Sequence, residues 1–185
     1  MNRLLIVSAL VLFCSLLFVQ AQPESTGFAP TLHARVVSDP IAELSGIVKS
    51  PRRENLFWVH NDSGDSARIF AINSDAQSIL PTYSKFTNYP DAPESGKSQW
   101  QGFEVLYANN VDWEDIAADA SYLYLSDMGN NGNERKDMAI YAISEIDPTA
   151  STRSAVVQKY PVVYPDQTGF PDPTWNFDSE SLFVA

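Results

Sequence analysis

Short apolar runs, separated by clusters of turn-forming residues, make up most of the chain beyond residue 32. The runs are rich in β-branched and aromatic residues, and Gly, Asn, Asp and Pro gather between them. Apolar residues hardly ever recur at the spacing of three and four positions that a helix face requires. The pattern therefore predicts an all-β domain that covers residues 33–185.

The expected strands are the runs in which β-branched and aromatic residues concentrate. They cover residues 45–49, 56–60, 68–72, 79–86, 103–107, 115–118, 122–126, 139–144, 158–164 and 181–185. Residues 87–102 are rich in Pro, Ser and Asp. This composition predicts an irregular insertion between two of the strands.

Parts of this strand pattern occur more than once. The first strand recurs at intervals of 69 and 66 residues when Ile47, Ile116 and Leu182 are aligned. The second and third strands recur once. The aligned segments are Leu56–Asp62 with Leu123–Gly129, and Arg68–Asn73 with Ala139–Ser144. A four-stranded unit that repeats at a near-constant interval predicts a β-propeller in which each unit is one blade.

The length of the chain limits how much of such a propeller it can form. Two blades and the opening strand of a third account for the whole domain, whereas a closed propeller needs about 4–8 blades. We therefore expect residues 33–185 to be a partial propeller and the chain to be the N-terminal part of a longer protein. Otherwise the last run, residues 181–185, would form an unpaired apolar edge. A complete small β-sandwich is the alternative.

The first 21 residues have the layout of a secretory signal peptide. Arg3 precedes an apolar run over residues 4–19, and small residues stand at the positions that cleavage after Ala21 requires. Residues 22–32, rich in Pro, Ser, Thr and Gly, are expected to form a flexible leader. We therefore expect a secreted or periplasmic protein. A lipoprotein modified at Cys14 and an uncleaved membrane anchor are the alternatives.

The composition narrows the range of partners. The chain has 23 acidic and 12 basic residues and a formal net charge of −11. Without a basic cluster, this charge argues against nucleic acid and, beyond the signal peptide, against a membrane surface. Cys14, the single cysteine, lies in the expected signal peptide. Disulfides and cysteine-ligated metals are therefore excluded from the mature chain. The oligomeric state is left open.

Two stretches of the chain resemble a known group of proteins. They are Glu43–Asn73, which contains ELSGI and LFWVHNDSG, and Asp112–Asn131, which begins DWEDIA. A similar acidic start, NFDSESL, occurs at Asn176–Leu182. These motifs resemble the secreted bacterial propellers of the SdiA-regulated and phytase-like ("esterase-like activity of phytase") kind. The resemblance implies a TolB-like six-bladed propeller, a fold that serves both binding proteins and hydrolases.

Acidic residues gather at one set of loops in the expected blades. Loops between the second and third strands emerge on the same face of a propeller as the connections between blades. Carboxylates that converge there repel one another unless a cation neutralises them, and their oxygens suit Ca²⁺. The predicted ligands of this Ca²⁺-type site are Glu43, Asp62, Asp112, Glu114, Asp127 and Glu180. Tight turns also need Asn, Asp and Gly, and this is the alternative explanation for the loops.

Four further residues of this face are candidates for ligand contacts. They are Trp113, His60, Asn61 and Asn131. An aromatic ring beside carboxylates suits a sugar ring, although packing between blades would explain Trp113 equally well.

Two functions are consistent with these candidates. One is a module that binds a small molecule, carbohydrate or phosphoester, or interacts with a partner, with Ca²⁺ as a structural element. The other is a metal-dependent hydrolase of a phosphoester, lactone or sugar. In the hydrolase, Glu114 or Asp115 would be a metal ligand or the general base.

Overall fold

The computed structural model describes residues 29–83, 86–87 and 97–185, and this part of the chain is all-β, as predicted. The expected signal peptide and most of the expected leader lie outside the described residues, and residues 29–32 have no regular secondary structure. Nowhere in the described ranges is there a helix with the length and apolar character needed to cross a membrane. The fold is therefore described for the unit formed by residues 33–185.

The first half of this unit is a four-stranded antiparallel meander. Its strands are β1 (Leu44–Lys49), β2 (Phe57–Asn61), β3 (Arg68–Ile72) and the short β4 (Ser78–Ile79). Each pairs with the next in chain order. The central strands β2 and β3 are buried along almost their whole length, and each contains a continuous apolar run, Phe57–Val59 and Ile69–Ile72.

The second half repeats this arrangement. Its strands are β8 (Trp113–Ala118), β9 (Tyr122–Asp127), β10 (Ala139–Ser144) and β11 (Arg153–Pro161). They also pair antiparallel in chain order. The two meanders are the repeated units that the aligned segments predict.

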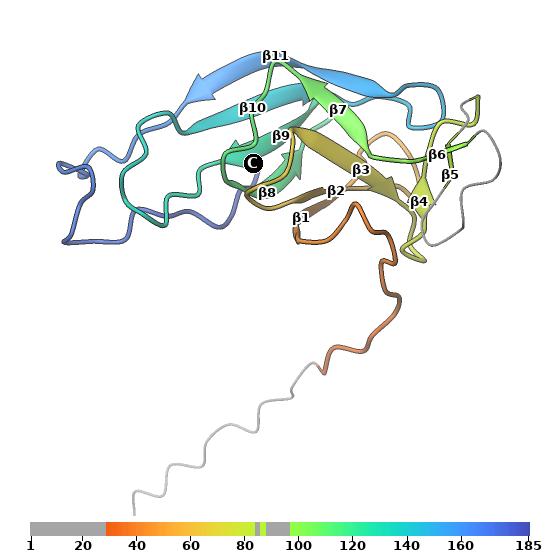
Figure 1. Ribbon diagram of the computed structural model, residues 1–185, viewed down its shortest axis with the longest axis horizontal. Helices are drawn as coiled ribbons and strands as arrows, with labels where there is room; N and C mark the ends of the chain where they lie inside the picture. The colour runs from red at the N-terminus through yellow and green to blue at the C-terminus, as the bar shows by residue number, and fades with distance from the viewer. Residues whose placement is uncertain (1–28, 84–85, 88–96) are drawn as a thin grey trace, which may run out of the picture. The chain divides into compact units, whose positions relative to one another are not determined.

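One strand between the meanders joins β3 of the first to β11 of the second. β7 (Phe103–Leu106) pairs antiparallel with β3 and parallel with β11. At the other end of the series β1 lies beside β8, where the Ser45 hydroxyl donates to the Glu114 carbonyl at 2.9 Å. The sheet order β1-β2-β3-β7-β11-β10-β9-β8 is therefore barrel-like and nearly closed (Figure 1).

A small ribbon accompanies this sheet. The short strands β5 (Phe86–Thr87) and β6 (Ser98–Gln99) pair parallel with each other. They belong to the region where the sequence predicts a strand over residues 79–86 and an irregular insertion over residues 87–102.

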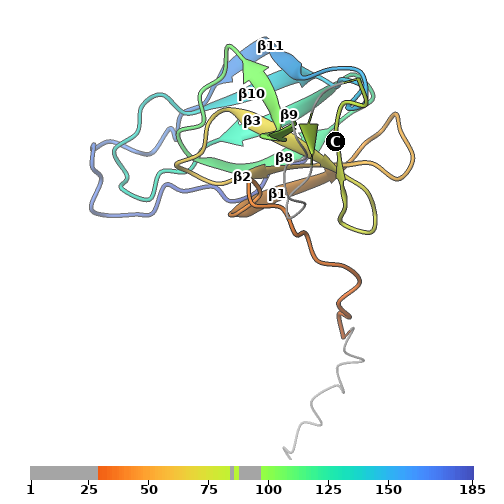
Figure 2. The same cartoon turned by 45° about the vertical axis from the view of Figure 1, so that its right-hand side comes forward.

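In Figure 2, turned by 45°, β1 and β8 again lie next to each other along the lower side of the sheet.

A large apolar cluster packs residues of both meanders together. Trp58 from β2 meets Phe103 from β7 edge to face, with ring centroids 5.5 Å apart, and Trp100 meets Phe103 in the same way at 4.8 Å. Leu123 and Leu125 from β9 are fully buried in the same cluster. The packing therefore ties residues from both repeats to the strand that bridges them.

The two first strands share an irregularity. The register of β1 shifts between Leu44 and Gly46, and that of β8 shifts between Trp113 and Asp115. Ser45 and Glu114 therefore occupy equivalent bulge positions, 69 residues apart. A bulge at the same place in both repeats supports the alignment of the first strands.

The alignment of the second strands was wrong by one residue. Ile47 pairs with Val59 and Ile116 pairs with Leu125, so Val59 and Leu125 are equivalent. The sequence alignment instead placed Val59 opposite Ser126. Both segments begin with a continuous apolar run, Leu56–Val59 and Leu123–Leu125, and a run of this kind lacks the alternation that would fix its register.

Two predicted strands also differ from the structure. The last strand of the second repeat begins at Arg153 rather than residue 158, because Arg153–Ala155 pairs with β7, a partner remote in sequence. Residues 181–185 were expected to be a strand, but they have no regular secondary structure. One of their backbone groups does reach β8, since Leu182 N donates to the Asp115 carboxylate at 2.7 Å.

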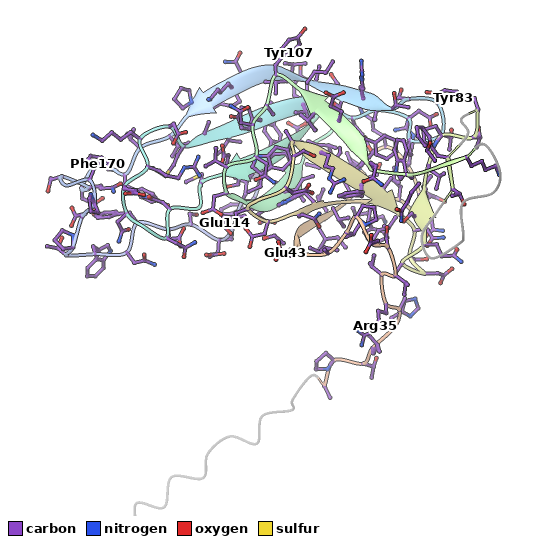
Figure 3. All side chains as sticks on the ribbon, viewed as in Figure 1. Arg35, Glu43, Tyr83, Tyr107, Glu114 and Phe170 are labelled. Carbon is purple, nitrogen blue, oxygen red and sulfur yellow. The ribbon has the colours of Figure 1, made fainter. Side chains whose placement is uncertain are left out.

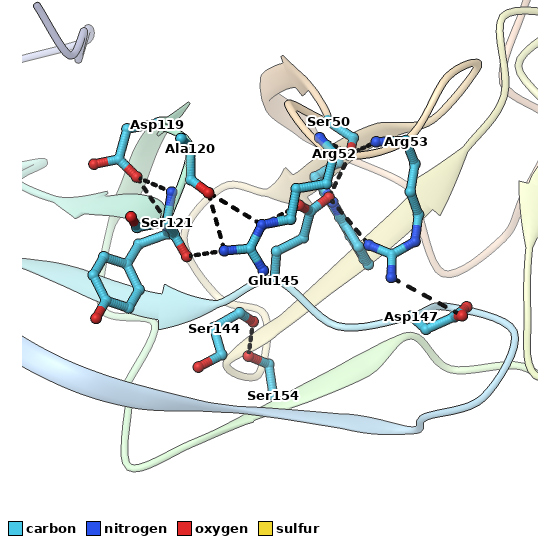
Figure 4. Close-up of polar contacts among 12 residues, drawn as sticks. Ser50, Arg52, Arg53, Asp119, Ala120, Ser121, Ser144, Glu145, Asp147 and Ser154 are labelled. Carbon is cyan, nitrogen blue, oxygen red and sulfur yellow. Dashed lines mark hydrogen bonds and ion pairs between the residues drawn. The ribbon is translucent and has the colours of Figure 1, made fainter.

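A buried carboxylate fastens the two repeats together beyond the C-terminal ends of β1 and β8. The Glu145 side chain is 1% exposed, and its Oε1 accepts hydrogen bonds from Ser50 Oγ at 2.5 Å and Trp58 Nε1 at 2.9 Å. Arg52 and Arg53 approach the same carboxylate, each at 3.8 Å (Figure 4). Its donors come from the first repeat, so the contact joins the two units.

Gly46 allows the two first strands to approach each other. A Cβ at this position would overlap His60 Nε2 and lie 2.9 Å from the backbone nitrogen of Ile116. We expect Gly46→Ala to lower the free energy of unfolding by about 1–3 kcal/mol, because the crowded atoms are buried or belong to the backbone. Urea unfolding measures the loss. Gly132→Ala, whose nearest neighbours stand 3.5 Å away, is the control. Equal stability of the two variants would contradict the close approach.

Candidate functional site

Five carboxylates converge near the start of β8 and the ends of β2 and β9. Oxygens of Asp62, Asp112 and Glu114 all lie within 4.8 Å of one another, and the same holds for Glu114, Asp178 and Glu180. Glu114 belongs to both groups and joins them. We call these five residues the acidic cluster.

Backbone hydrogen bonds hold the acidic cluster together. Asp62 follows β2, and its backbone nitrogen donates to Glu43 O at 2.9 Å. Gly129 N donates to Asp112 O at 3.1 Å, which fixes the chain after β9 against the residue before β8. Asn130 N donates to the Asp178 carboxylate at 2.7 Å and so attaches the C-terminal segment. The cluster is therefore built from three separate parts of the chain.

The bulge in β8 explains why a glutamate is buried there. Along a regular strand, successive side chains point to opposite faces. In β8 the bulge lets the neighbours Trp113 and Glu114 both be buried. Gly129 supplies the room, since a Cβ at that position would overlap the carboxylates of both Glu114 and Asp112.

The proton affinities of the cluster reflect this crowding. Burial raises the pKa of Glu114 to about 8, assisted by the hydrogen bond with Glu180 and by the charges of Glu180, Asp112 and Asp62. The pKa of Asp112 is also raised, first by burial and then by the charge of Asp62, while Arg135 opposes the shift. Without a cation, a proton on Glu114 relieves part of the repulsion.

Asp127 serves the cluster from outside it. Its Oδ1 accepts a hydrogen bond from Asp112 N at 3.0 Å and pairs with Arg135 Nη2 at 3.0 Å. Burial raises the pKa of Asp127, and the bonds from Asp112 and Arg135 partly offset that rise. The Asp127 carboxylate therefore positions the backbone of Asp112 and forms an ion pair with Arg135.

Four of the six predicted metal ligands come together in the acidic cluster: Asp62, Asp112, Glu114 and Glu180. Asp127 and Glu43 belong to neither carboxylate group. Glu43 is exposed, and Figure 3 shows Glu43 and Glu114 near each other on the lower side of the sheet.

The predicted ligand contacts His60 and Trp113 are both fully buried. The His60 Nδ1 lies 2.8 Å from Asn61 O, and burial lowers the pKa of the imidazole. The Trp113 indole donates to Asn109 O at 2.9 Å and meets His60 edge to face at 5.7 Å. Trp113 thus takes part in packing, which was the alternative explanation for its place in the sequence.

The remaining predicted residues have different surroundings. Asn61 is buried, and its amide nitrogen donates to Pro40 O and to the Asp65 carboxylate, both at 2.7 Å. Asn131 is exposed. Asp115, a candidate ligand or base, accepts backbone N–H groups from Ile116 on one oxygen and from Leu182 on the other.

Three residues at the cluster were not among the predicted ligands. Asp178 stands two positions before Glu180, and this acidic pair was its signal in the sequence. Arg135 and Tyr164 had no such signal. Burial, then the charge of Asp178, raises the pKa of Tyr164, so its hydroxyl belongs to the same electrostatic environment.

The chain matches no known protein family, no curated protein and no solved structure at a significant level. Its own geometry therefore carries the functional argument.

The raised pKa of Glu114 makes stability depend on pH. The folded chain keeps this proton up to about pH 8, whereas the unfolded chain loses it near the ordinary value of 4.5. The folded state therefore binds the extra proton between these values, and stability falls as the pH rises through that window. In EDTA, urea unfolding at about pH 5 and about pH 8 should show a fall on the order of 2 kcal/mol that Glu114→Gln removes.

The control for this pH dependence is Glu54→Gln, which changes an exposed glutamate in the β1–β2 loop. This variant should keep the fall seen in the unaltered chain. If Glu114→Gln also keeps it, the proton is held elsewhere.

Proposed function

We propose that the acidic cluster binds a divalent cation, Ca²⁺, within a secreted binding module. The observation that carries this proposal is the convergence of five carboxylates on the buried Glu114. Buried charges are costly unless they are paired or bound to a metal. Burial is the main cause of the raised pKa of Glu114, and a cation at this position would neutralise the neighbouring charges that add to it.

The chemistry of the donors supports Ca²⁺ over other metals. Carboxylate oxygens are hard ligands, and the described part of the chain brings no imidazole or thiol into the two carboxylate groups. Ca²⁺ takes 6–8 oxygens in flexible geometry, which suits ligands drawn from several loops. Mg²⁺ is smaller, requires a nearly ideal octahedral arrangement of ligands, and usually keeps several of its bound water molecules.

We also propose that the two meanders are blades of a β-propeller, as the resemblance to the SdiA-regulated and phytase-like group implies. In support, their first strands lie side by side, and equivalent bulges occur at Ser45 and Glu114. An experimental structure of the natural gene product tests this. The equivalents of β1 and β8 should surround one axis, and a closed barrel would contradict the proposal.

A metal-dependent hydrolase is the second candidate. The observation that favours it is the raised pKa of Glu114, to about 8, because a group that titrates near neutral pH suits general acid or base work. Assays with Ca²⁺ and aryl phosphates or lactones distinguish the candidates. Turnover that Glu114→Gln abolishes would favour the hydrolase, and binding without turnover would favour the module.

Calorimetry on the full chain tests the cation directly. We expect Ca²⁺ to bind with a dissociation constant in the micromolar to millimolar range and to raise the melting temperature. Asp178→Asn should weaken binding by about tenfold or more, because it removes a charge from one carboxylate group.

The matched control is Asp75→Asn, which changes an aspartate whose side chain is 70% exposed and which belongs to neither carboxylate group. Its affinity for Ca²⁺ should equal that of the unaltered chain. Absence of heat and of thermal stabilisation at millimolar Ca²⁺ would exclude the site. Equal weakening by both variants would place the cation elsewhere.

A further inference from the structure

A second candidate site lies on the bridge between the repeats, on residues that the acidic cluster does not use. A cavity of about 450 Å³ opens beside the start of β3 and around β7. Its lining includes Ser66, Arg68, Gln101, Gly102, Glu104 and Tyr107. A volume of this order is typical of small-molecule sites.

Tyr107 stands at the rim of this cavity in a backbone conformation that is costly for an aromatic residue. The backbone φ of Tyr107 is +67°, and the residue is 86% exposed (Figure 3). The surrounding turn is closed by a bond from Ala108 N to Val105 O at 3.4 Å. At its third position a turn with positive φ favours Gly or Asn, so the turn itself does not explain a tyrosine. Strain of this kind concentrates at functional sites.

The part of the cavity lining that Arg68 forms is polar and heavily hydrogen-bonded. The Arg68 guanidinium pairs with both oxygens of Asp65, at 2.7 and 2.8 Å, and donates from Nη1 to Gln101 O at 2.8 Å. It lies over the Phe70 ring, 5.2 Å from the centroid. Together with a longer contact to Gln101 Oε1, these bonds account for four of the five N–H groups that a guanidinium carries. One donor remains for a ligand.

The charges of the cavity are balanced. Asp65 neutralises Arg68, and Arg153 Nε pairs with the Glu104 carboxylate at 2.9 Å. An anionic ligand would therefore find no unpaired cation at Arg68 or Arg153, in a chain whose net charge is −11. The cavity instead offers hydrogen-bond donors and acceptors whose charges are already compensated, beside an exposed ring.

We propose that this cavity binds a neutral saccharide. The Tyr107 ring would cover the apolar C–H face of a sugar, while Arg68, Gln101 and Glu104 would exchange hydrogen bonds with its hydroxyl groups. A sugar hydroxyl both donates and accepts, which suits a wall that presents a guanidinium, an amide and a carboxylate. A tyrosine ring buries a large apolar area and keeps a hydroxyl group at its edge, which suits a contact that is partly exposed to water.

Saturation-transfer NMR on the full chain tests the proposal with a panel of neutral mono- and disaccharides. At least one saccharide should receive saturation at millimolar concentration, and its C–H protons on one face should receive the most. Tyr107→Phe should retain binding because it keeps the ring. Tyr107→Gly should weaken binding by about tenfold or more, the size expected for loss of a stacking contact.

Tyr107→Gly also separates binding from folding. Glycine relieves the positive φ, so this variant should be at least as stable as the unaltered chain in urea while it loses the saccharide. Tyr83→Ala is the control, since Tyr83 is 65% exposed and lies away from Tyr107 in Figure 3. This variant should bind normally.

Three results would overturn the proposal. The first is the absence of saturation transfer to every saccharide of the panel. The second is unchanged binding by Tyr107→Gly. The third is transfer to a tetramethylammonium probe in place of the sugars, which would assign the ring to a cationic ligand.

Discussion

The close approach of β1 and β8 is the constraint on which the rest of the structure depends. Gly46 has no side chain where His60 and the backbone of Ile116 fill the space, and the Ser45 hydroxyl bonds to the Glu114 carbonyl. This contact brings the two ends of the series of strands together and fixes the bulge of β8 against the first repeat. The bulge in turn directs Glu114 inward, where carboxylates from three parts of the chain meet it.

A proton and a cation are competing ways to neutralise the same cluster. Arg135 opposes the rise in the pKa of Asp112, but its guanidinium already pairs with Asp127 and donates to Gly129 O. The remaining excess of negative charge is met by a proton on Glu114 when no metal is bound. A bound Ca²⁺ would displace that proton, so affinity must rise with pH. Proton binding and cation binding are therefore coupled through Glu114, the residue that both carboxylate groups share.

Sequence predicted the elements of the fold better than their partners. Runs such as Arg68–Ile72 and Ala139–Ser144 are apolar apart from one terminal residue each and were located within a residue. Residues Arg153–Ala155 lack that signal and form strand through pairing with β7, which local pattern does not reveal. At the site, Glu114 was predicted because it precedes a repeated strand. The burial of Trp113 beside it depends on the bulge, which breaks the alternation that sequence analysis assumes.

A comparison of two buried glutamates explains why Glu114, and not Glu145, belongs to the candidate site. Glu145 is surrounded by donors, since Ser50 and Trp58 bond to it and two arginines stand near. The charge of this carboxylate is offset by arginines of its own fold, and its Oε1 accepts two hydrogen bonds, so no ligand is needed to neutralise it. Glu114 is surrounded by four other carboxylates, which neither donate a hydrogen bond when ionised nor offset its charge. Burial alone therefore does not identify a site, whereas burial among like charges leaves a requirement that an additional positive species has to meet.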